Sequence, residues 1–203
     1  MTDHDRPLVE SDVADDPVTQ FSRWFAEAAE RVRLPEAVAV ATADLQAIPS
    51  VRMVLLKHWD DEGFVFYTNH RSQKGRELDA NPNAALLAHW DVLGRQVRVD
   101  GPVARVPAEE ADAYFDSRPR GHQISAHASH QSEVISSRRA LEDRVAVLQA
   151  EFEGRPVPRP QWWGGYRIRP LQVEFWQHRD DRLHDRLRYV ADGDGWRRER
   201  LQP

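Results

Sequence analysis

The sequence feature that most constrains the fold is a succession of short apolar runs, each of strand length and bounded by turn residues. Such runs, rich in β-branched and aromatic residues, indicate β-strands, and the short turns between them favour antiparallel neighbours. A closed or half-closed barrel accommodates many short strands. The sequence therefore predicts six to eight strands, drawn from residues 36–44, 50–59, 64–69, 84–90, 95–106, 166–170, 173–177, 182–190 and 196–201.

Three or four helices are expected outside this barrel. Asp16 followed by Pro17 has the pattern of an N-cap and a first helical residue, and apolar residues at three- and four-residue spacing continue to about Arg33. No Gly-rich phosphate loop follows a strand, which argues against a dinucleotide-binding α/β fold. The fold class is therefore mainly β with peripheral helices (α+β), the other helices being expected from Ser72 to about Asn81, from Pro107 to about Ser117 and over 137–153.

Composition and charge limit the classes of function. The chain has 203 residues, enough for one domain of ordinary size, and a net charge of −5 argues against general binding to nucleic acid or membrane surfaces. The sequence has no cysteine, which suits the cytoplasm and excludes thiolate metal sites. Residues 1–16 are acidic with little to bury, so we expect a flexible tail followed by one domain over 17–203.

Three groups of residues are candidates for binding an anion. Arg52 and Lys57 bracket an apolar strand, although their odd spacing places them on opposite faces. Lys74 lies at a helix N-terminus, where free N–H groups favour phosphate, and Tyr114 and Arg118 are spaced to share a helical face. Taken singly, each also fits an ordinary surface contact.

The run "RLHDR" at residues 182–186 is the fourth candidate. On a strand, Arg182, His184 and Arg186 would share one face, close to Trp176. Such a row suits a flat, anionic, heteroaromatic ligand, although a solvated edge strand is the simpler explanation of any one residue. No serine has the surroundings of a hydrolase nucleophile, and no histidine pair has zinc-site spacing, so no metal is expected.

In this order, the motifs "RMVLLK", "FYTN", "YFDSRPRG", "WWGGYRIRP", "VEFWQ" and "RLHDRLRY" resemble the pyridoxine (pyridoxamine) 5'-phosphate oxidase family. The resemblance runs from about Asp16 to the C-terminus. It implies an FMN-binding split β-barrel and a homodimer whose two subunits both contact FMN. It also implies oxidation of pyridoxamine or pyridoxine 5'-phosphate to pyridoxal 5'-phosphate by hydride transfer to FMN, which dioxygen reoxidises with release of hydrogen peroxide.

The resemblance implies a role for each matching residue. Arg182 and His184 would be catalytic. FMN would be bound by Arg52, Met53, Val54, Leu55, Leu56, Lys57, Tyr67, Thr68, Lys74, Gln96, Gln131, Ser132, Trp176 and Arg186. The phosphorylated substrate would be bound by Lys57, Tyr114, Arg118, His122, Arg182, Leu183 and His184.

Three positions depart from the family pattern. Gln73 replaces an arginine expected on the FMN phosphate, a loss for which Arg71 could compensate, and His122 and His127 replace a serine and a tryptophan at the substrate end. These changes leave two alternatives open. One is a related FMN-dependent oxidase of the phenazine-biosynthesis type acting on a dihydroaromatic compound, and the other is a non-catalytic flavin-binding protein.

Overall fold

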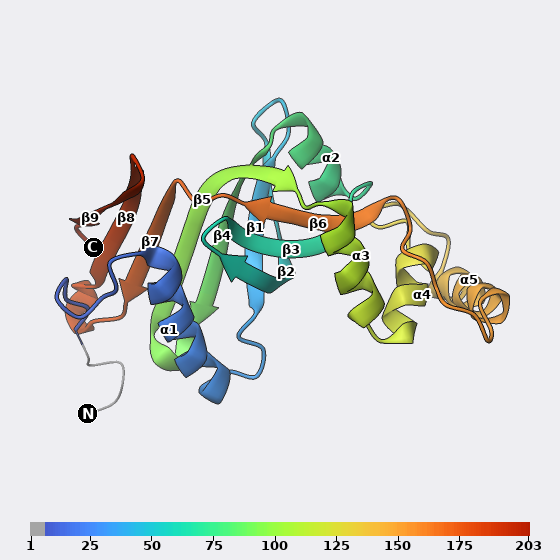
Figure 1. The fold of residues 1–203 in the computed structure, drawn as a ribbon, viewed down its shortest axis with the longest axis horizontal. Helices are drawn as coiled ribbons and strands as arrows, with labels where there is room; N and C mark the ends of the chain where they lie inside the picture. Colours follow the sequence, from blue (N-terminus) through green and yellow to red (C-terminus); the bar gives the residue numbers. More distant parts are fainter. Residues whose placement is uncertain (1–6) are drawn as a thin grey trace.

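Nine antiparallel strands of the described chain, residues 7–203, hydrogen-bond into one curled sheet in this computed structural model (Figure 1). The strand order is β4-β1-β2-β3-β6-β5-β7-β8-β9, and a further pairing of β4 with β5 closes six strands into a barrel. The bounds are β1 Ala37–Ala43, β2 Pro49–Asp60, β3 Gly63–Asn69, β4 Asn83–Trp90, β5 Arg95–Arg105, β6 Trp163–Ile168, β7 Gln172–Gln177, β8 Asp185–Asp192 and β9 Gly195–Arg200. The split barrel expected from the sequence is confirmed.

Strand β5 joins the barrel to its extension. Its first half, residues 95–100, pairs with β7, whereas Val103–Arg105 pairs with β6. Strands β7, β8 and β9 therefore continue the sheet outward from one side of the barrel, and they lie at the opposite end of the molecule from α4 and α5 (Figure 1).

Five α-helices surround the sheet, and side-chain caps define three of their starts. Asp16 accepts a hydrogen bond from the Thr19 N–H (2.8 Å), and Ser72 and Ser137 cap α2 and α5 in the same way. The predicted helices are thus confirmed, and one more is present. The bounds are α1 Pro17–Arg31, α2 Gln73–Ala80, α3 Ala108–Ser117, α4 Arg120–Ala128 and α5 Arg138–Glu151, with single 3₁₀ turns at Asp91–Leu93 and Asp180–Arg182.

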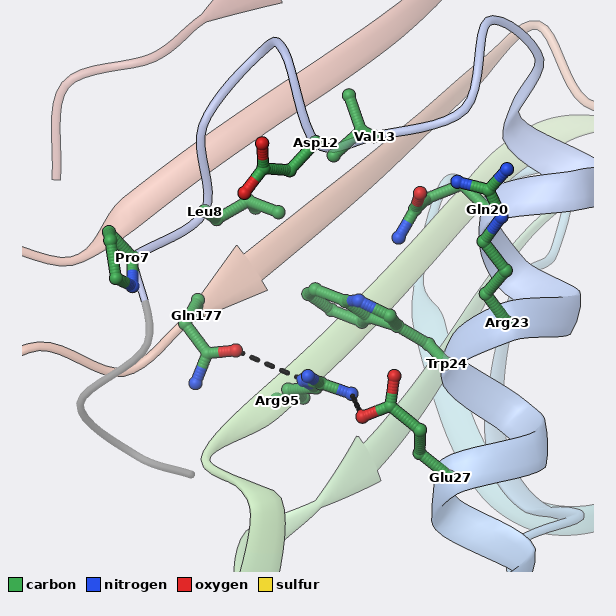
Figure 2. A pocket seen from close by; sticks show the side chains of 10 residues that line it. All are labelled: Pro7, Leu8, Asp12, Val13, Gln20, Arg23, Trp24, Glu27, Arg95 and Gln177. Atoms are coloured by element: carbon green, nitrogen blue, oxygen red, sulfur yellow. Dashed lines mark hydrogen bonds and ion pairs between the residues drawn. The ribbon is translucent and has the colours of Figure 1, made fainter. Parts of the chain in front are cut away.

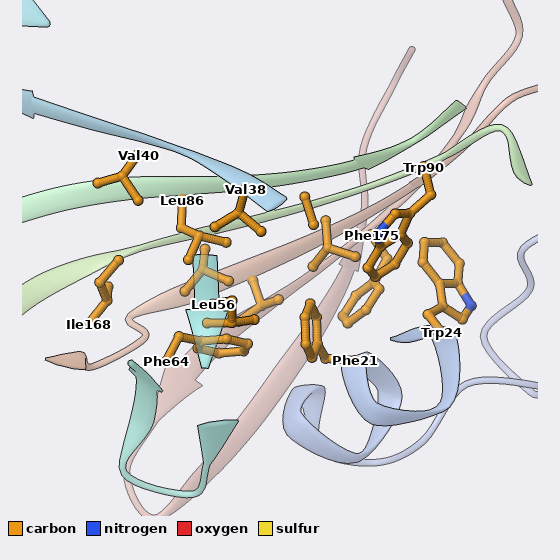
Figure 3. Packing of buried hydrophobic residues seen from close by; sticks show 14 of the residues in the cluster. Phe21, Trp24, Val38, Val40, Leu56, Phe64, Leu86, Trp90, Ile168 and Phe175 are labelled. Atoms are coloured by element: carbon orange, nitrogen blue, oxygen red, sulfur yellow. The ribbon is translucent and has the colours of Figure 1, made fainter. Parts of the chain in front are cut away.

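Helix α1 closes the main core (Figure 3). Phe21 meets Phe64 edge to face, with ring centroids 5.0 Å apart, and Trp24 meets Phe175 in the same way at 5.2 Å. Both residues are almost fully buried, and each such side chain contributes roughly 1.5–3 kcal/mol through burial. A second, smaller cluster of Phe115, Ile124 and Trp163 supports α3 and α4.

The structure differs from the expectations at several places, and the first is the number of strands, which is nine within residues 7–203 where six to eight were expected. Helix α4 was not predicted, and the supposed linker over 154–165 ends inside β6, which begins at Trp163. The predicted strand over 182–190 begins only at Asp185, because residues 180–182 form a 3₁₀ turn and Asp181 and Arg182 have positive φ. The alternation expected of Arg182, His184 and Arg186 therefore does not hold.

The expected flexible tail spans 1–16, and residues 1–6 lie outside the described residues. Residues 7–16 are packed against the C-terminal strands. Leu8 is buried, its N–H donates to Asp185 Oδ2 (3.1 Å), and the Tyr189 hydroxyl donates to the Ala14 carbonyl (2.7 Å). No helix of the described chain is long and apolar enough to cross a bilayer.

Candidate active site

A buried cation lies at the N-terminus of α2. Lys74 is 6% exposed, and its Nζ donates to Gln131 Oε1 (2.9 Å), Thr68 Oγ1 (3.1 Å) and Ser72 Oγ (3.3 Å). All three acceptors are neutral, and within the described chain no carboxylate forms an ion pair with Lys74. Burial lowers the pKa of Lys74 to about 8. An ammonium group with only neutral partners, at a helix N-terminus, suits an added anion.

Arg52 extends this group from β2. Its guanidinium donates to Thr42 Oγ1 (2.5 Å) and to the Val40 carbonyl (3.2 Å), and it forms an ion pair with Glu77 (3.2 Å). The positive charge of Arg52 contributes to the lowered pKa of Lys74, so the two cations are close enough to repel each other. The Ser132 hydroxyl accepts from the Gln73 N–H (3.1 Å) and joins the same end of α2.

A stack of aromatic rings forms a second group. Tyr67 on β3 lies on Tyr114 of α3, with centroids 4.0 Å apart, and Trp163 continues the stack. Arg118 follows α3 and places its Cζ 4.5 Å from the Trp163 ring. Its Nη1 is buried without a hydrogen-bond partner, and burial lowers its pKa. Arg118 is therefore a second cation with no acidic partner in the described chain.

The other predicted residues of β2 divide between the two faces of the strand. Leu56 is buried and Val54 packs against the core, whereas Met53 and Leu55 are exposed. Lys57 lies on the exposed side, at a β-bulge, with its Nζ 3.8 Å from Glu36. Arg52 and Lys57 thus have different partners, as their odd spacing predicts.

A third group lies on β5, β7 and β8. Gln96 pairs with Trp176, and Trp176 pairs with Arg186, so the three residues form one row across adjacent strands. Glu174, 6% exposed, accepts from Arg186 Nε (2.7 Å) and fixes the guanidinium. The hydrogen bond to Glu174 raises the pKa of Arg186.

His184 lies beside this row. Its ring is 4.6 Å from that of Trp176, and its Nδ1 accepts from the backbone N–H of Arg179 (3.1 Å). An Nδ1 that accepts cannot carry a proton, so the neutral ring carries its proton on Nε2. Burial, with His178 and Arg182 nearby, lowers the pKa of His184 and favours this neutral form. Arg182 and Leu183 are exposed on the turn before β8.

No hydrogen bond, ion pair or ring contact described for this chain joins the third group to the first two. The opposite face of the same strands is closed by α1 and residues 7–13, which line a cavity of about 200 Å³ (Figure 2). There Arg95 donates to Glu27 (2.7 Å) and Gln177 (3.0 Å). This cavity lies behind Gln96 and Trp176 and does not belong to the candidate site.

The positions that depart from the family pattern have defined surroundings. Gln73 Nε2 donates to Glu77 Oε1 (2.8 Å), and Arg71 stacks on Trp162 at 4.8 Å, which does not support compensation by Arg71 at the Lys74 site. His127 hydrogen-bonds the Pro158 carbonyl (2.7 Å) and packs on Phe152, so it has a structural contact. His122 is exposed in the first turn of α4.

Sequence reasoning missed four residues of these groups: Trp163, whose ring contacts both Tyr114 and Arg118, and the carboxylates Glu77, Glu110 and Glu174. Glu110 accepts from the Tyr67 hydroxyl (3.2 Å) and fixes that ring. The i, i+4 spacing of Gln73 and Glu77 was an available signal, but nothing in the sequence relates Glu110 to Tyr67.

Two family models match the chain. Residues 25–151 match the model described as pyridoxamine 5'-phosphate oxidase, and residues 163–203 match the pyridoxine 5'-phosphate oxidase C-terminal dimerisation region. The third group lies partly in that second region.

Relatives cover nearly the whole chain. A pyridoxine/pyridoxamine 5'-phosphate oxidase of Rubrobacter xylanophilus is 56% identical, over 97% of this chain and 91% of its own length. A pyridoxine/pyridoxamine 5'-phosphate oxidase of Thermosynechococcus vestitus is 53% identical, over 97% of this chain and 93% of its own length. Among solved structures, PhzG from Burkholderia lata in complex with tetrahydrophenazine-1-carboxylic acid is 37% identical, with a TM-score of 0.91 over 98% of this chain and all of that one.

Proposed function

The chain belongs to the pyridoxamine 5'-phosphate oxidase family, and from that premise we propose that it is an FMN-dependent oxidase of phosphorylated vitamin B6 vitamers. It converts pyridoxine 5'-phosphate directly to pyridoxal 5'-phosphate, and it converts pyridoxamine 5'-phosphate to the imine, which water hydrolyses to the same aldehyde with release of ammonia; dioxygen is the final acceptor. One observation at the site supports this assignment most strongly. Lys74 and Arg118 are two separate cations without acidic partners in the described chain, and the reaction requires two phosphate sites, one for cofactor and one for substrate.

The residues at α2 fit the FMN phosphate. Lys74 supplies the charge, and Thr68 and Gln131 supply polar atoms beside it. Gln96, Trp176 and Arg186 offer an aromatic face and fixed hydrogen-bond donors, which suit the flavin ring. When bound, FMN would supply the two-electron acceptor for hydride from the carbon that bears the amine or alcohol at ring position 4, and dioxygen would reoxidise it to give hydrogen peroxide.

The chain's own residues hold the substrate. Arg118 and Tyr114 bind its phosphate, and Lys57 contributes a further positive charge. The fixed position of this phosphate limits where the pyridine ring can lie, which brings the reacting carbon to one place. His184 presents its Nε2–H to the ring, and Arg182 stabilises negative charge that develops there.

The protein is a homodimer, since its C-terminal residues match a dimerisation region. We assign the Lys74 group and the Gln96–Trp176–Arg186 row of one FMN site to different subunits, which accounts for the absence of contacts between them within residues 7–203 of one chain. We place the enzyme in the cytoplasm, which a sequence without cysteine suits.

The phenazine-type alternative is the second candidate because of the similarity to PhzG, whose structure contains tetrahydrophenazine-1-carboxylic acid. Relatives of higher identity are oxidases of phosphorylated vitamers, and the unpartnered Arg118 suits a phosphate. The vitamer oxidase is therefore the better-supported assignment.

Anaerobic stopped-flow absorbance tests this function on protein reconstituted with FMN. Pyridoxine and pyridoxamine 5'-phosphates should each bleach the flavin absorbance band at about 450 nm, and admission of air should restore it. A bound flavin that neither compound bleaches would overturn the vitamer assignment and favour a dihydroaromatic substrate.

A further inference from the structure

Glu77 is a buried carboxylate on α2 that the chemistry described above does not use. It is 8% exposed, and its two oxygens accept hydrogen bonds from four side chains of α2, β1 and β2. Oε1 accepts from Gln73 (2.8 Å). Oε2 accepts from the hydroxyls of Ser50 (2.6 Å) and Thr42, and from Arg52 Nη2 (3.2 Å).

These bonds keep Glu77 ionised. Burial opposes the charged form, but the hydrogen bonds from Ser50, Thr42 and Gln73 and the charge of Arg52 outweigh it and lower the pKa of Glu77 to about 2. A permanent negative charge is therefore present behind Arg52 at neutral pH.

Glu77 is one of four hydrogen-bond acceptors that hold Arg52. In the described chain its hydrogen bonds all use the terminal nitrogens, toward Val40, Thr42, Ser50 and Glu77. Glu77 is the only acid among these partners. Because Arg52 and Lys74 repel each other, removal of that acid leaves neutral acceptors alone to hold the guanidinium beside the lysine.

We propose that Glu77 is a positioning residue for FMN binding: it fixes Arg52 beside Lys74, so that both cations are in place before the phosphate arrives. This inference rests on the proposed function. Glu77 acts through Arg52 and not on the ligand, because its own charge is negative and would repel a phosphate. Gln73, which departs from the family pattern, donates a hydrogen bond to Glu77 Oε1 and so helps to hold the Glu77 carboxylate in place.

A double-mutant cycle tests the proposal. Apoproteins of the wild type, Glu77→Gln, Arg52→Ala and the double variant are titrated with FMN, and flavin fluorescence gives each Kd. We expect Glu77→Gln to weaken binding about tenfold or more in the wild-type background. In the Arg52→Ala background, Glu77→Gln should not weaken FMN binding. The arginine that Glu77 orients is then absent, and the substitution removes a negative charge that repels the phosphate.

A purely structural Glu77 gives a different result. Equal weakening in both backgrounds would show that Glu77 only anchors α2 to the sheet, and unchanged affinity in the wild-type background would also overturn the proposal. Thermal unfolding of each apoprotein checks that it is folded. If Glu77→Gln does not fold, Gln73→Ala, which removes a donor to Glu77 that does not hydrogen-bond Arg52, should give the same background dependence on a smaller scale.

Failure of the proposed function has its own signature. Wild-type apoprotein that takes up no FMN would overturn the function and this inference together. Wild-type binding with equal losses in the two backgrounds would overturn only the role of Glu77.

Discussion

At the scale of single residues, the partners of each buried or half-buried cation distinguish candidates for ligand binding from residues that support the fold. Arg95 and Arg167 are paired with carboxylates, Arg95 with Glu27 at 2.7 Å and Arg167 with Asp60 at 2.5 Å, so their charges are satisfied within the fold. Lys74 and Arg118 have no such partner in the described chain. Leaving a charge buried without a counterion costs free energy, so the sites that do so are candidates for binding an anion.

Lys74→Ala tests the cofactor site. It removes one charge-assisted contact, so FMN affinity should fall by roughly 1.5–3 kcal/mol, about ten- to a hundredfold. Titration of the apoprotein by flavin fluorescence gives the value. Arg76→Ala, an exposed residue of the same helix, is the matched control and should bind as the wild type does. Unchanged affinity in Lys74→Ala would remove this residue from the site.

The pH dependence of FMN affinity follows from the same lysine. Its pKa in the apoprotein is about 8, with Arg52 and Glu77 as charged neighbours, and a bound phosphate stabilises the protonated form and raises that pKa. The complex then holds more protons than the free protein above pH 8, so affinity should fall as pH rises from about 8. Kd measured from pH 7 to 10 checks this, and Lys74→Ala should abolish the dependence.

Arg182→Ala separates chemistry from cofactor binding. Arg182 is exposed on the turn before β8, outside the Gln96–Trp176–Arg186 row, so the variant should keep its FMN. Turnover should fall by about tenfold or more, because a charge that stabilises the developing anion is lost. The absorbance of the purified protein reports bound flavin, and steady-state assays report kcat. Loss of the yellow cofactor would assign Arg182 to FMN instead.

At the scale of elements, periodicity and caps predicted most of the fold, and the exceptions have physical causes. Helix α4 was missed because "RGHQISAHA" directly follows Pro119 and shows only a weak apolar stripe, supplied by Ile124 and two alanines. The turn at 180–182 was missed because positive φ at Asp181 and Arg182 is set by the surrounding structure and has no glycine to signal it. The prediction that Arg182, His184 and Arg186 share one strand face was therefore wrong, because the strand begins only at Asp185.

Arg200 makes several of the polar contacts that hold the acidic N-terminal segment on the sheet. Arg200 on β9 donates to the Glu10 carboxylate (2.8 Å), to the Leu8 carbonyl (2.8 Å) and to Asp185. Arg200→Ala should release residues 7–14 from the sheet, seen as faster amide hydrogen exchange at Leu8–Ala14. Global stability should change by only about 1 kcal/mol or less, since these pairs are largely exposed. Arg197→Ala, on the same strand, is the control; unchanged protection in Arg200→Ala would show that apolar packing alone holds the segment.

At the scale of the whole molecule, the candidate FMN-binding residues form two separate groups, and no spacing in the sequence predicts this separation. The Lys74 group lies at α2 and the Trp176 row lies on the extension of the sheet (Figure 1). Between them, the outward face of β2 and β1 is apolar: Val51, Met53 and Leu55 are exposed and pair with Ala41, Ala39 and Ala37. Small and apolar side chains on a continuous strand surface are typical of a face that a second subunit covers.

Val51→Glu tests whether this face holds the dimer and completes the FMN site. Val51 is 68% exposed in the single chain and lies outside the residues assigned to FMN. A carboxylate there would be buried without a partner at the dimer interface, which should cost about 3 kcal/mol or more, roughly a hundredfold in the dimer dissociation constant. Sedimentation velocity measures assembly, and FMN titration at the same concentrations measures binding.

Because the Lys74 group and the Trp176 row are assigned to different subunits, the loss of the dimer and the loss of FMN binding should occur together, whereas Val51→Ile should retain both. A monomer that binds FMN as tightly as the wild type would show that one chain completes the site, and a dimer that persists in Val51→Glu would place the interface elsewhere.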